Sequence, residues 1–192
     1  MKYERIERAT FLERPNRFIA YARIAGKQET IHVKNTGRCA ELLVPEAEIF
    51  VQESDNPERK TKWDLIGVRK GNRLINMDSQ IPNKVVEEWL RAGNLFLEPV
   101  TVRPETTYGN SRFDFYVESG EKKAFIEVKG VTLEEDGVVR FPDAPSERAV
   151  KHMEELIRAK KEGYDAYVFL VIQMKGVRYF TSNMDTQPEF GE

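Results

Sequence analysis

The sequence has little that could form a covalent or metal-bound framework. Its only cysteine, Cys39, cannot form an internal disulfide, and its two histidines lie far apart, so no zinc-ligand set is present. A small buried apolar role is expected for Cys39. No apolar run approaches the ~20 residues that a membrane helix needs, and the amino terminus shows no secretory leader. These absences favour a cytoplasmic protein without membrane partners.

Familiar catalytic motifs are also missing. The chain has no glycine-rich phosphate loop, no nucleophile-elbow serine and no histidine pair at metal spacing. The net charge is −2, which argues against a protein that coats nucleic acid by bulk electrostatics. However, residues 1–80 carry +3 and the remainder carries −5, which suits a phosphate-contacting module joined to a carboxylate-lined metal site. Ordinary surface variation would explain this asymmetry equally well.

The first 80 residues of this 192-residue chain have the pattern of an all-β module. Short runs rich in branched and aromatic residues alternate with turn signals such as Ala25-Gly26-Lys27 and Asn35-Thr36-Gly37. Five or six such strands predict a small barrel, and a five-stranded oligonucleotide-binding (OB) barrel is one candidate. The predicted strands cover residues 6–12, 18–24, 29–33, 49–53 and 63–68.

Residues 81–192 have a different pattern, which predicts an α/β sandwich with a crossover connection. A joint helix is expected from Pro82 or Asn83 to about Gly93, and a second helix from Ser146 to about 162. The predicted strands cover residues 96–102, 112–117, 123–132 and 166–174. The chain is thus predicted to be a two-domain protein of mixed α/β class, with a boundary near residue 80.

Three charged residues interrupt two strands that are otherwise apolar. Strand alternation puts Phe113, Phe115 and Val117 on one face and Asp114 on the other, while Glu127 and Lys129 share a face of the next strand. The turn at residues 118–121 favours a hairpin that would place the three charges side by side. Two carboxylates and an ammonium group are suited to binding a hard cation and a phosphodiester. A solvated sheet face with a cross-strand ion pair would show the same pattern.

The second helix has an apolar arc at Ala149, Val150, Met153, Leu156 and Ile157, which should pack on the sheet. Its other side carries Arg148, Lys151, His152 and Glu155. Such a face is typical of a solvated helix, but Arg148 and Lys151 could also bind phosphate oxygens. His152 is too isolated to be a metal ligand and fits a positioning or phosphate contact better.

Several long blocks, in the same order, resemble the sugar fermentation stimulation protein A (SfsA) family over nearly the whole chain. The matching blocks include Asn35-Thr36-Gly37, Asp78-Ser79 with Pro82-Asn83, residues 105–115, residues 126–133 and residues 141–148. The resemblance implies an OB-fold-like barrel at residues 1–80, followed at residues 81–192 by a PD-(D/E)XK nuclease-like mixed sheet with flanking helices. It also implies DNA binding linked to the regulation of sugar (maltose) metabolism.

The resemblance also implies roles for individual residues. The catalytic candidates are Asp114, Glu127, Lys129 and Glu88, with Glu88 as an extra acid on the joint helix. The expected ligands of Mg²⁺ or Mn²⁺ are Asp114, Glu127, the Val128 carbonyl and, through water, Glu105. The expected DNA contacts are Arg17, Lys34, Asn35, Arg38, Arg112, Arg148, Lys151 and His152.

Two features depart from the family pattern. Ala149 replaces a usual glycine, and relatives commonly continue for a helix and a strand beyond Glu192. A sheet edge left open there could be covered by a second subunit, so a homodimer is expected.

Three functions stay open at this level. The first is a metal-dependent deoxyribonuclease, and the second is a DNA-binding regulator whose nuclease-like core does not cut. The third is an enzyme that uses the same cluster on a small anionic metabolite, which would require a deep closed pocket.

Overall fold

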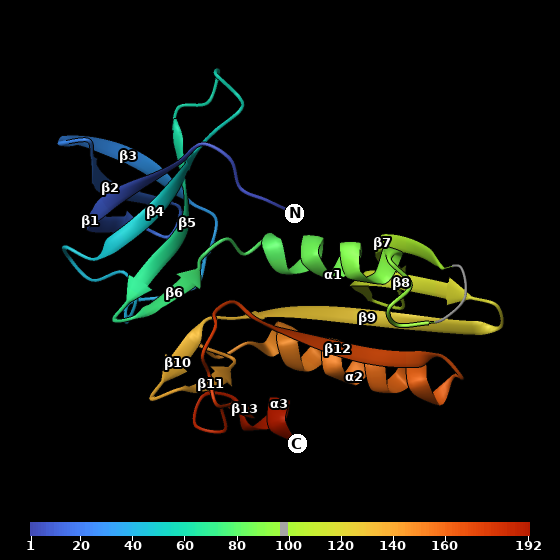
Figure 1. Ribbon diagram of the computed structural model, residues 1–192. Coiled ribbons are helices and arrows are strands. Elements are labelled where there is room, and N and C mark those ends of the chain that lie inside the picture. Colours follow the sequence, from blue (N-terminus) through green and yellow to red (C-terminus); the bar gives the residue numbers. More distant parts are fainter. Residues whose placement is uncertain (97–99) are drawn as a thin grey trace.

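The computed structural model describes residues 1–96 and 100–192, which form two lobes joined by a helix (Figure 1). The first lobe contains only strands: β1 (Ile6–Asn16), β2 (Ile19–Ile24), β3 (Lys27–Val33), β4 (Glu48–Glu53), β5 (Trp63–Lys70) and β6 (Arg73–Asn76). Each predicted strand of this region is present. The sequence prediction did not include β6.

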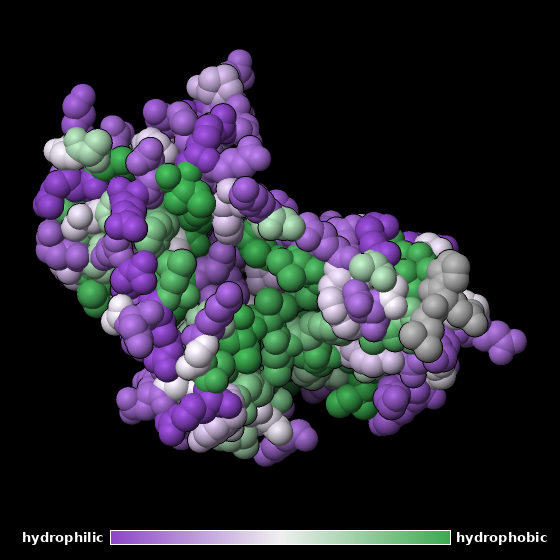
Figure 2. All heavy atoms as spheres, in the orientation of Figure 1, coloured by the Kyte–Doolittle hydropathy of each residue, from purple (hydrophilic) through white to green (hydrophobic). Residues whose placement is uncertain are grey.

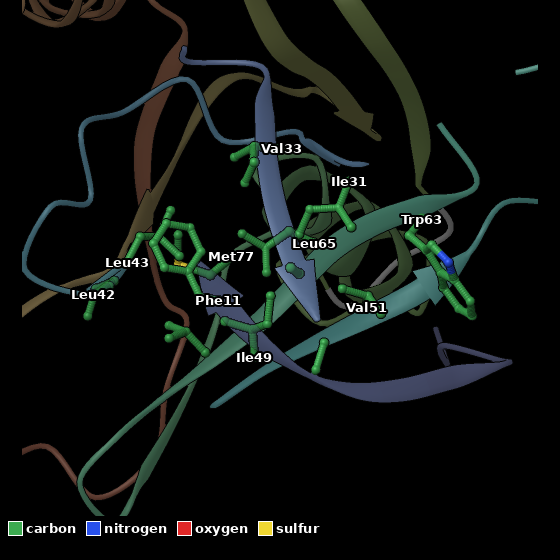
Figure 3. Packing of buried hydrophobic residues seen from close by; sticks show 14 of the residues in the cluster. Phe11, Ile31, Val33, Leu42, Leu43, Ile49, Val51, Trp63, Leu65 and Met77 are labelled. Carbon is green, nitrogen blue, oxygen red and sulfur yellow. The ribbon is translucent and has the colours of Figure 1, made fainter. Parts of the chain in front are cut away.

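The first five strands close into a barrel, as the OB prediction required. Their order is β3-β2-β1-β4-β5, and a parallel pairing of β3 with β5, with Ile31 opposite Trp63, joins the two ends. Alternate residues point inward and form the core cluster seen in Figure 3, in which Phe11, Ile31 and Leu65 are almost fully buried. Burying a side chain of this size stabilises the fold by roughly 1.5–3 kcal/mol.

The second lobe is a four-stranded mixed sheet between two helices (Figure 1). Its elements are α1 (Ile81–Arg91), β7 (Thr101–Tyr108), β8 (Ser111–Ser119), β9 (Lys122–Val131), α2 (Glu147–Lys161) and β12 (Asp165–Ile172). The strand order is β12-β9-β8-β7, and only β12 is parallel to its neighbour β9. A parallel pair needs a crossover connection, which α2 supplies. The predicted strand 96–102 begins in residues that lie partly outside the described ranges, and β7 starts at Thr101.

The two helices cover opposite faces of this sheet. Val86 and Leu90 of α1 pack with Phe115 and Val117, whereas Leu156 of α2 packs in a second cluster with Phe113 and Phe125. The prediction that Phe113 shares a face with Phe115 and Val117 is therefore wrong.

The reason is a local irregularity at Asp114. Opposite it on β7, Glu105 has a left-handed backbone (φ +51°), and the pairing skips from Pro104↔Phe115 to Thr106↔Phe113. One residue is skipped on each strand, so the register is unchanged, but the side chains on the two sides of this point pack on opposite faces of the sheet.

A small third sheet and a short terminal helix, which the sequence did not predict, lie beside α2. They are β10 (Leu133–Glu135), β11 (Val138–Phe141), β13 (Tyr179–Ser182) and α3 (Pro188–Gly191). None of the described helices is long and apolar enough to cross a membrane.

Among the contacts between the lobes, those of Gln173 and Glu134 involve polar side chains. The Gln173 amide donates hydrogen bonds to the Asn76 carbonyl (3.1 Å), the Asn76 side chain (3.0 Å) and the Asp78 carbonyl (3.2 Å). Glu134 of β10, whose side chain is 2% exposed, forms ion pairs with Lys70 (3.1 Å) and Arg73 (2.8 Å) from the β5–β6 hairpin. Polar side chains therefore help to fix the barrel relative to the mixed sheet, and Met174 packs against the barrel core beside them.

Candidate metal and phosphate site

Asp114 lies where β8 and β9 separate. Antiparallel pairing of the two strands runs from Ser119↔Lys122 to Phe115↔Ile126. At the next position the Asp114 carboxylate accepts a hydrogen bond from the Val128 N–H (2.7 Å). Its other oxygen accepts one from the Asn83 amide at the start of α1 (2.7 Å). A side chain thus replaces the strand backbone as the hydrogen-bond acceptor and is held against β9.

Glu127 projects from β9 towards α2 and is almost completely buried, with its side chain 4% exposed. Its Oε1 accepts from the Lys129 ammonium (2.6 Å) and lies 2.6 Å from His152 Nδ1. An Nδ1–H tautomer of His152 would donate to this carboxylate oxygen. The second oxygen, Oε2, is buried and has no hydrogen-bond partner among the described residues. A buried carboxylate oxygen without a donor is costly, so this atom marks a place suited to a cation.

His152 reaches Glu127 because α2 is rotated relative to the prediction. Ser146 caps the helix by accepting from the Ala149 N–H (3.2 Å), as expected. The buried face, however, consists of Ala149, His152, Leu156 and Ala159, whereas Ile157 is exposed. The predicted apolar arc is right for Ala149, Met153 and Leu156, but it was wrong for Ile157 and in placing His152 on the solvent side. A hydrophobicity wheel ranks histidine as polar and does not detect a partner such as Glu127 on the facing strand.

Electrostatics couples the two carboxylates. Burial raises the pKa of Asp114 above its ordinary 3.8, and the negative charge of Glu127 raises it further. The hydrogen bonds from Val128 and Asn83 and the charge of Lys129 lower it in part. The Glu127 charge thus disfavours the charged form of Asp114, and a divalent cation at the site would offset this repulsion.

The residues present fit a hard divalent cation in part. Among the described residues, no three His, Cys, Asp or Glu side chains are grouped closely enough to hold a metal by themselves. Two carboxylates completed by a backbone oxygen, water and substrate match Mg²⁺, which usually keeps several waters. Asp114 and the free Oε2 of Glu127 would be the protein side-chain ligands.

A cationic pocket of about 520 Å³ opens beside His152. The β7–β8 turn forms one wall and the first turns of α2 form the other. The lining residues are Asn110, Ser111, Arg112, Glu147, Arg148, Lys151 and His152. The Lys151 ammonium bridges the walls by donating to the Asn110 carbonyl (3.0 Å), and the buried Ser111 hydroxyl has no partner among the described residues. Four of the predicted phosphate contacts thus lie around one polar cavity next to Glu127.

Two acids predicted for the site are not joined to it. Glu88 lies on the exposed side of α1, with its side chain 58% exposed, and pairs with the amino-terminal ammonium (2.7 Å). Glu105 is exposed on the edge strand β7 and pairs with Arg112 (3.6 Å). The α1 residue that touches Asp114 is Asn83. It is five positions before Glu88, which turns the two side chains about 140° apart on a helix.

The predicted DNA contacts of the barrel separate into two groups. Arg38 is exposed, and exposed Arg17 lies over the Phe18 ring (4.9 Å). In contrast, Lys34 is paired with Asp78 (2.9 Å) and Asp64 (3.4 Å). Asn35 uses its side chain to accept from the Gly37 N–H (2.9 Å). Lys34 and Asn35 therefore organise the barrel rim, and only the two arginines are available to an external phosphate.

Arg14, which the sequence analysis did not single out, shapes this rim. Its guanidinium donates to the backbone carbonyls of Arg17, Asn35, Gly37 and Arg38 at 2.7–2.9 Å. The rim also approaches the segment before α2, because a Cβ on Gly37 would lie 2.9 Å from Asp143 Oδ2. Barrel rim and second lobe thus meet near the start of α2.

A larger cleft of about 820 Å³ lies elsewhere, between β4–β6 of the barrel and residues 172–176. Its lining is mainly apolar and includes Ile6, Phe50, Ile66 and Met174, and Figure 2 shows apolar residues gathered where the lobes meet. It contains none of the predicted catalytic residues. The third possible function, a metabolite enzyme, required a deep pocket at the charged cluster, which this cleft does not provide.

Comparison with known proteins gives consistent results. One family model, described as the SfsA N-terminal OB domain, matches residues 12–77, and another, the sugar fermentation stimulation protein RE domain, matches residues 80–192. A sugar fermentation stimulation protein homolog from Clostridium beijerinckii is 62% identical over all of this chain and 85% of the relative. Another, from Desulfitobacterium hafniense, is 61% identical over all of this chain and 84% of the relative.

A solved structure also matches the whole chain. It is described as Pyrococcus furiosus SfsA in complex with Ca²⁺, with a TM-score of 0.89 and 26% identity. The match covers 83% of that protein.

Proposed function

Because this chain belongs to the sugar fermentation stimulation protein family, we propose that it binds DNA and hydrolyses phosphodiester bonds with Mg²⁺ or Mn²⁺ at the Asp114–Glu127 site. The observation that carries the proposal is the buried Oε2 of Glu127, which has no partner among the described residues, beside the Asp114 carboxylate, whose pKa burial and the Glu127 charge raise. We place this activity in the cytoplasm.

In this proposal Asp114, Glu127 and the Val128 carbonyl hold the cation. The bound cation would supply a water of lowered pKa and neutralise charge on the phosphate. Asn83 and the Val128 N–H keep the Asp114 carboxylate in place, and His152 does the same for Glu127. Lys129 stabilises the charge that develops on the phosphate oxygens.

The cationic pocket fits the flanking strand. Arg148, Lys151 and Arg112 supply charge-assisted donors, and the Ser111 hydroxyl is free to donate. The solved relative is described as a complex with Ca²⁺, which is a hard cation with the same preference for oxygen ligands.

The test uses pure protein with single-stranded, duplex and branched DNA, in Mg²⁺, in Mn²⁺ and in chelator. We expect cutting that needs the cation and disappears in Asp114→Ala and Lys129→Ala. Glu88→Ala is the matched control, because Glu88 is an acid of the same lobe whose side chain faces away from the cluster. We expect the Glu88→Ala variant to cut DNA as the wild type does. Failure of the wild type to cut any substrate would refute the hydrolytic part.

The second candidate is a DNA-binding regulator of sugar metabolism genes without turnover. Exposed Arg17 and Arg38 on the barrel rim favour it, since surface cations are sufficient for salt-sensitive backbone contacts. It predicts binding that survives Asp114→Ala and Lys129→Ala, while Arg38→Ala weakens binding and lowers its salt dependence.

A further inference from the structure

We propose that Lys129 is an internal counter-ion, which an incoming divalent cation displaces from Glu127 while His152 keeps the carboxylate in place. The inference rests on the proposed metal site. It concerns how that site is held before the cation arrives and how occupancy releases the lysine.

The two oxygens of Glu127 are used unequally. Oε1 receives both donors, Lys129 Nζ and His152 Nδ1, each at 2.6 Å, while the buried Oε2 receives none from the described residues. Two donors crowded on one oxygen leave the other turned away from them. An ammonium at this position offsets the negative charge of Glu127 while no cation is bound.

Lys129 is the donor that can leave. Its flexible side chain has four methylene groups and is 15% exposed, so the ammonium can rotate away from Glu127 towards solvent. His152 is 7% exposed, stands on the inner face of α2 and packs edge-on against Phe113 with ring centroids 6.0 Å apart. A rigid imidazole on a packed helix fixes the carboxylate, as outer partners do in many metal sites.

The exchange has a functional consequence. While Lys129 is bound to Glu127, its ammonium is satisfied internally and is not free to meet a phosphate. A divalent cation next to Oε2 repels the ammonium, because like charges a few ångströms apart in a poorly hydrated site interact strongly. The lysine is thereby released for a substrate phosphate only when the cation is present.

The test measures metal binding directly, by calorimetric titration of the intact chain with MnCl₂ in the absence of DNA. Lys129→Met keeps most of the length of the side chain but removes the competing charge, and we expect Mn²⁺ to bind about tenfold tighter or more. Lys151→Met is the matched control, because that ammonium lies in the neighbouring pocket, is exposed and contacts Asn110. We expect it to change the Kd less than about threefold.

The second variant tests the anchor. His152→Ala should weaken Mn²⁺ binding by roughly 10–100-fold, the usual effect of losing a partner that orients a ligand. Lys129→Gln, which is polar and uncharged, should behave like Lys129→Met if charge rather than packing is responsible. Thermal melting in chelator verifies that each variant is folded, and added Mn²⁺ should raise the Tm of Lys129→Met more than that of the wild type.

The outcomes separate the two ideas. If the wild type binds Mn²⁺ but Lys129→Met and Lys129→Gln bind it equally or more weakly, the displacement mechanism is overturned and the metal site stands. If neither the wild type nor the lysine variants bind Mn²⁺, the metal site itself is refuted, and this inference with it. Tighter binding in both lysine variants, even without DNA cutting, supports the counter-ion role.

Discussion

Replacing Glu134 by glutamine should loosen the contact between the two lobes. Glu134 is 2% exposed and pairs with Lys70 and Arg73, whose side chains are 34% and 26% exposed. Breaking a fully buried ion pair costs about 3–5 kcal/mol, but these partly exposed cations can regain water. We therefore expect Glu134→Gln to lower the free energy of unfolding by about 2–4 kcal/mol at pH 7. For a chain of this size that corresponds to a fall in Tm of roughly 5–15 °C.

The loss should depend on pH. Burial alone would raise the pKa of Glu134, but the Gly137 N–H and the charges of Lys70 and Arg73 hold it below the ordinary 4.5. A carboxyl group with a lowered pKa stabilises the fold fully above its unfolded-state pKa, and this stabilisation is lost as the pH falls through the folded-state value. The difference between wild type and Glu134→Gln should thus be constant from pH 7 to about pH 5 and shrink at lower pH.

Denaturant unfolding followed by circular dichroism, from pH 7 to pH 3, measures this difference. Glu135→Gln is the matched control, because the next residue on the same strand is 63% exposed and pairs with Arg140 at the surface. Its loss should be at most about 1 kcal/mol. Equal losses in the two variants, or a loss at Glu134 that does not change with pH, would refute the role assigned to this contact.

Three further predictions follow from particular contacts. Gly130→Ala should destabilise the fold by about 1–3 kcal/mol in chemical denaturation, because the added Cβ would collide with Gln173 and lie 2.9 Å from Pro82. Unchanged stability would contradict this packing. Cys39, whose pKa burial raises to about 12, should resist alkylation at pH 8 until the protein unfolds, and rapid labelling of the native protein would be inconsistent with its burial. Lys34→Ala should lower the Tm, whereas Arg38→Ala should leave the Tm unchanged and weaken DNA binding measured by fluorescence anisotropy. The reverse pattern would show that the roles of these two cations have been misassigned.

The sequence predicted the architecture well because strand alternation and turn residues act locally. The barrel strands, the hairpin that carries Asp114, Glu127 and Lys129, and the cap at Ser146 each follow from short-range signals. The OB barrel and the following mixed sheet with helices are confirmed.

The parts of the site that the sequence misplaced depend on long-range geometry. His152 was assigned to the solvent side because its partner, Glu127, is 25 positions away and the wheel considers one helix alone. Asn83 was not recognised as a contact of Asp114, and Glu88 on the same helix was chosen instead. The sequence does not show how α1 docks on the sheet, and this docking decides which turn of the helix faces the gap between β8 and β9. Lys34 looked like a surface cation until the fold brought Asp64 and Asp78 beside it.

The polar contacts between the lobes limit how this chain can be divided into fragments. A fragment that begins at Ile81 would leave Glu134 buried without Lys70 and Arg73, and it would deprive the Gln173 amide of its acceptors at Asn76 and Asp78. A barrel fragment ending at Gln80 would in turn lose Met174 and its neighbours from the cleft wall and leave buried Ile66 and Ile75 more open to water. We therefore expect each lobe to be less stable alone than in the whole chain.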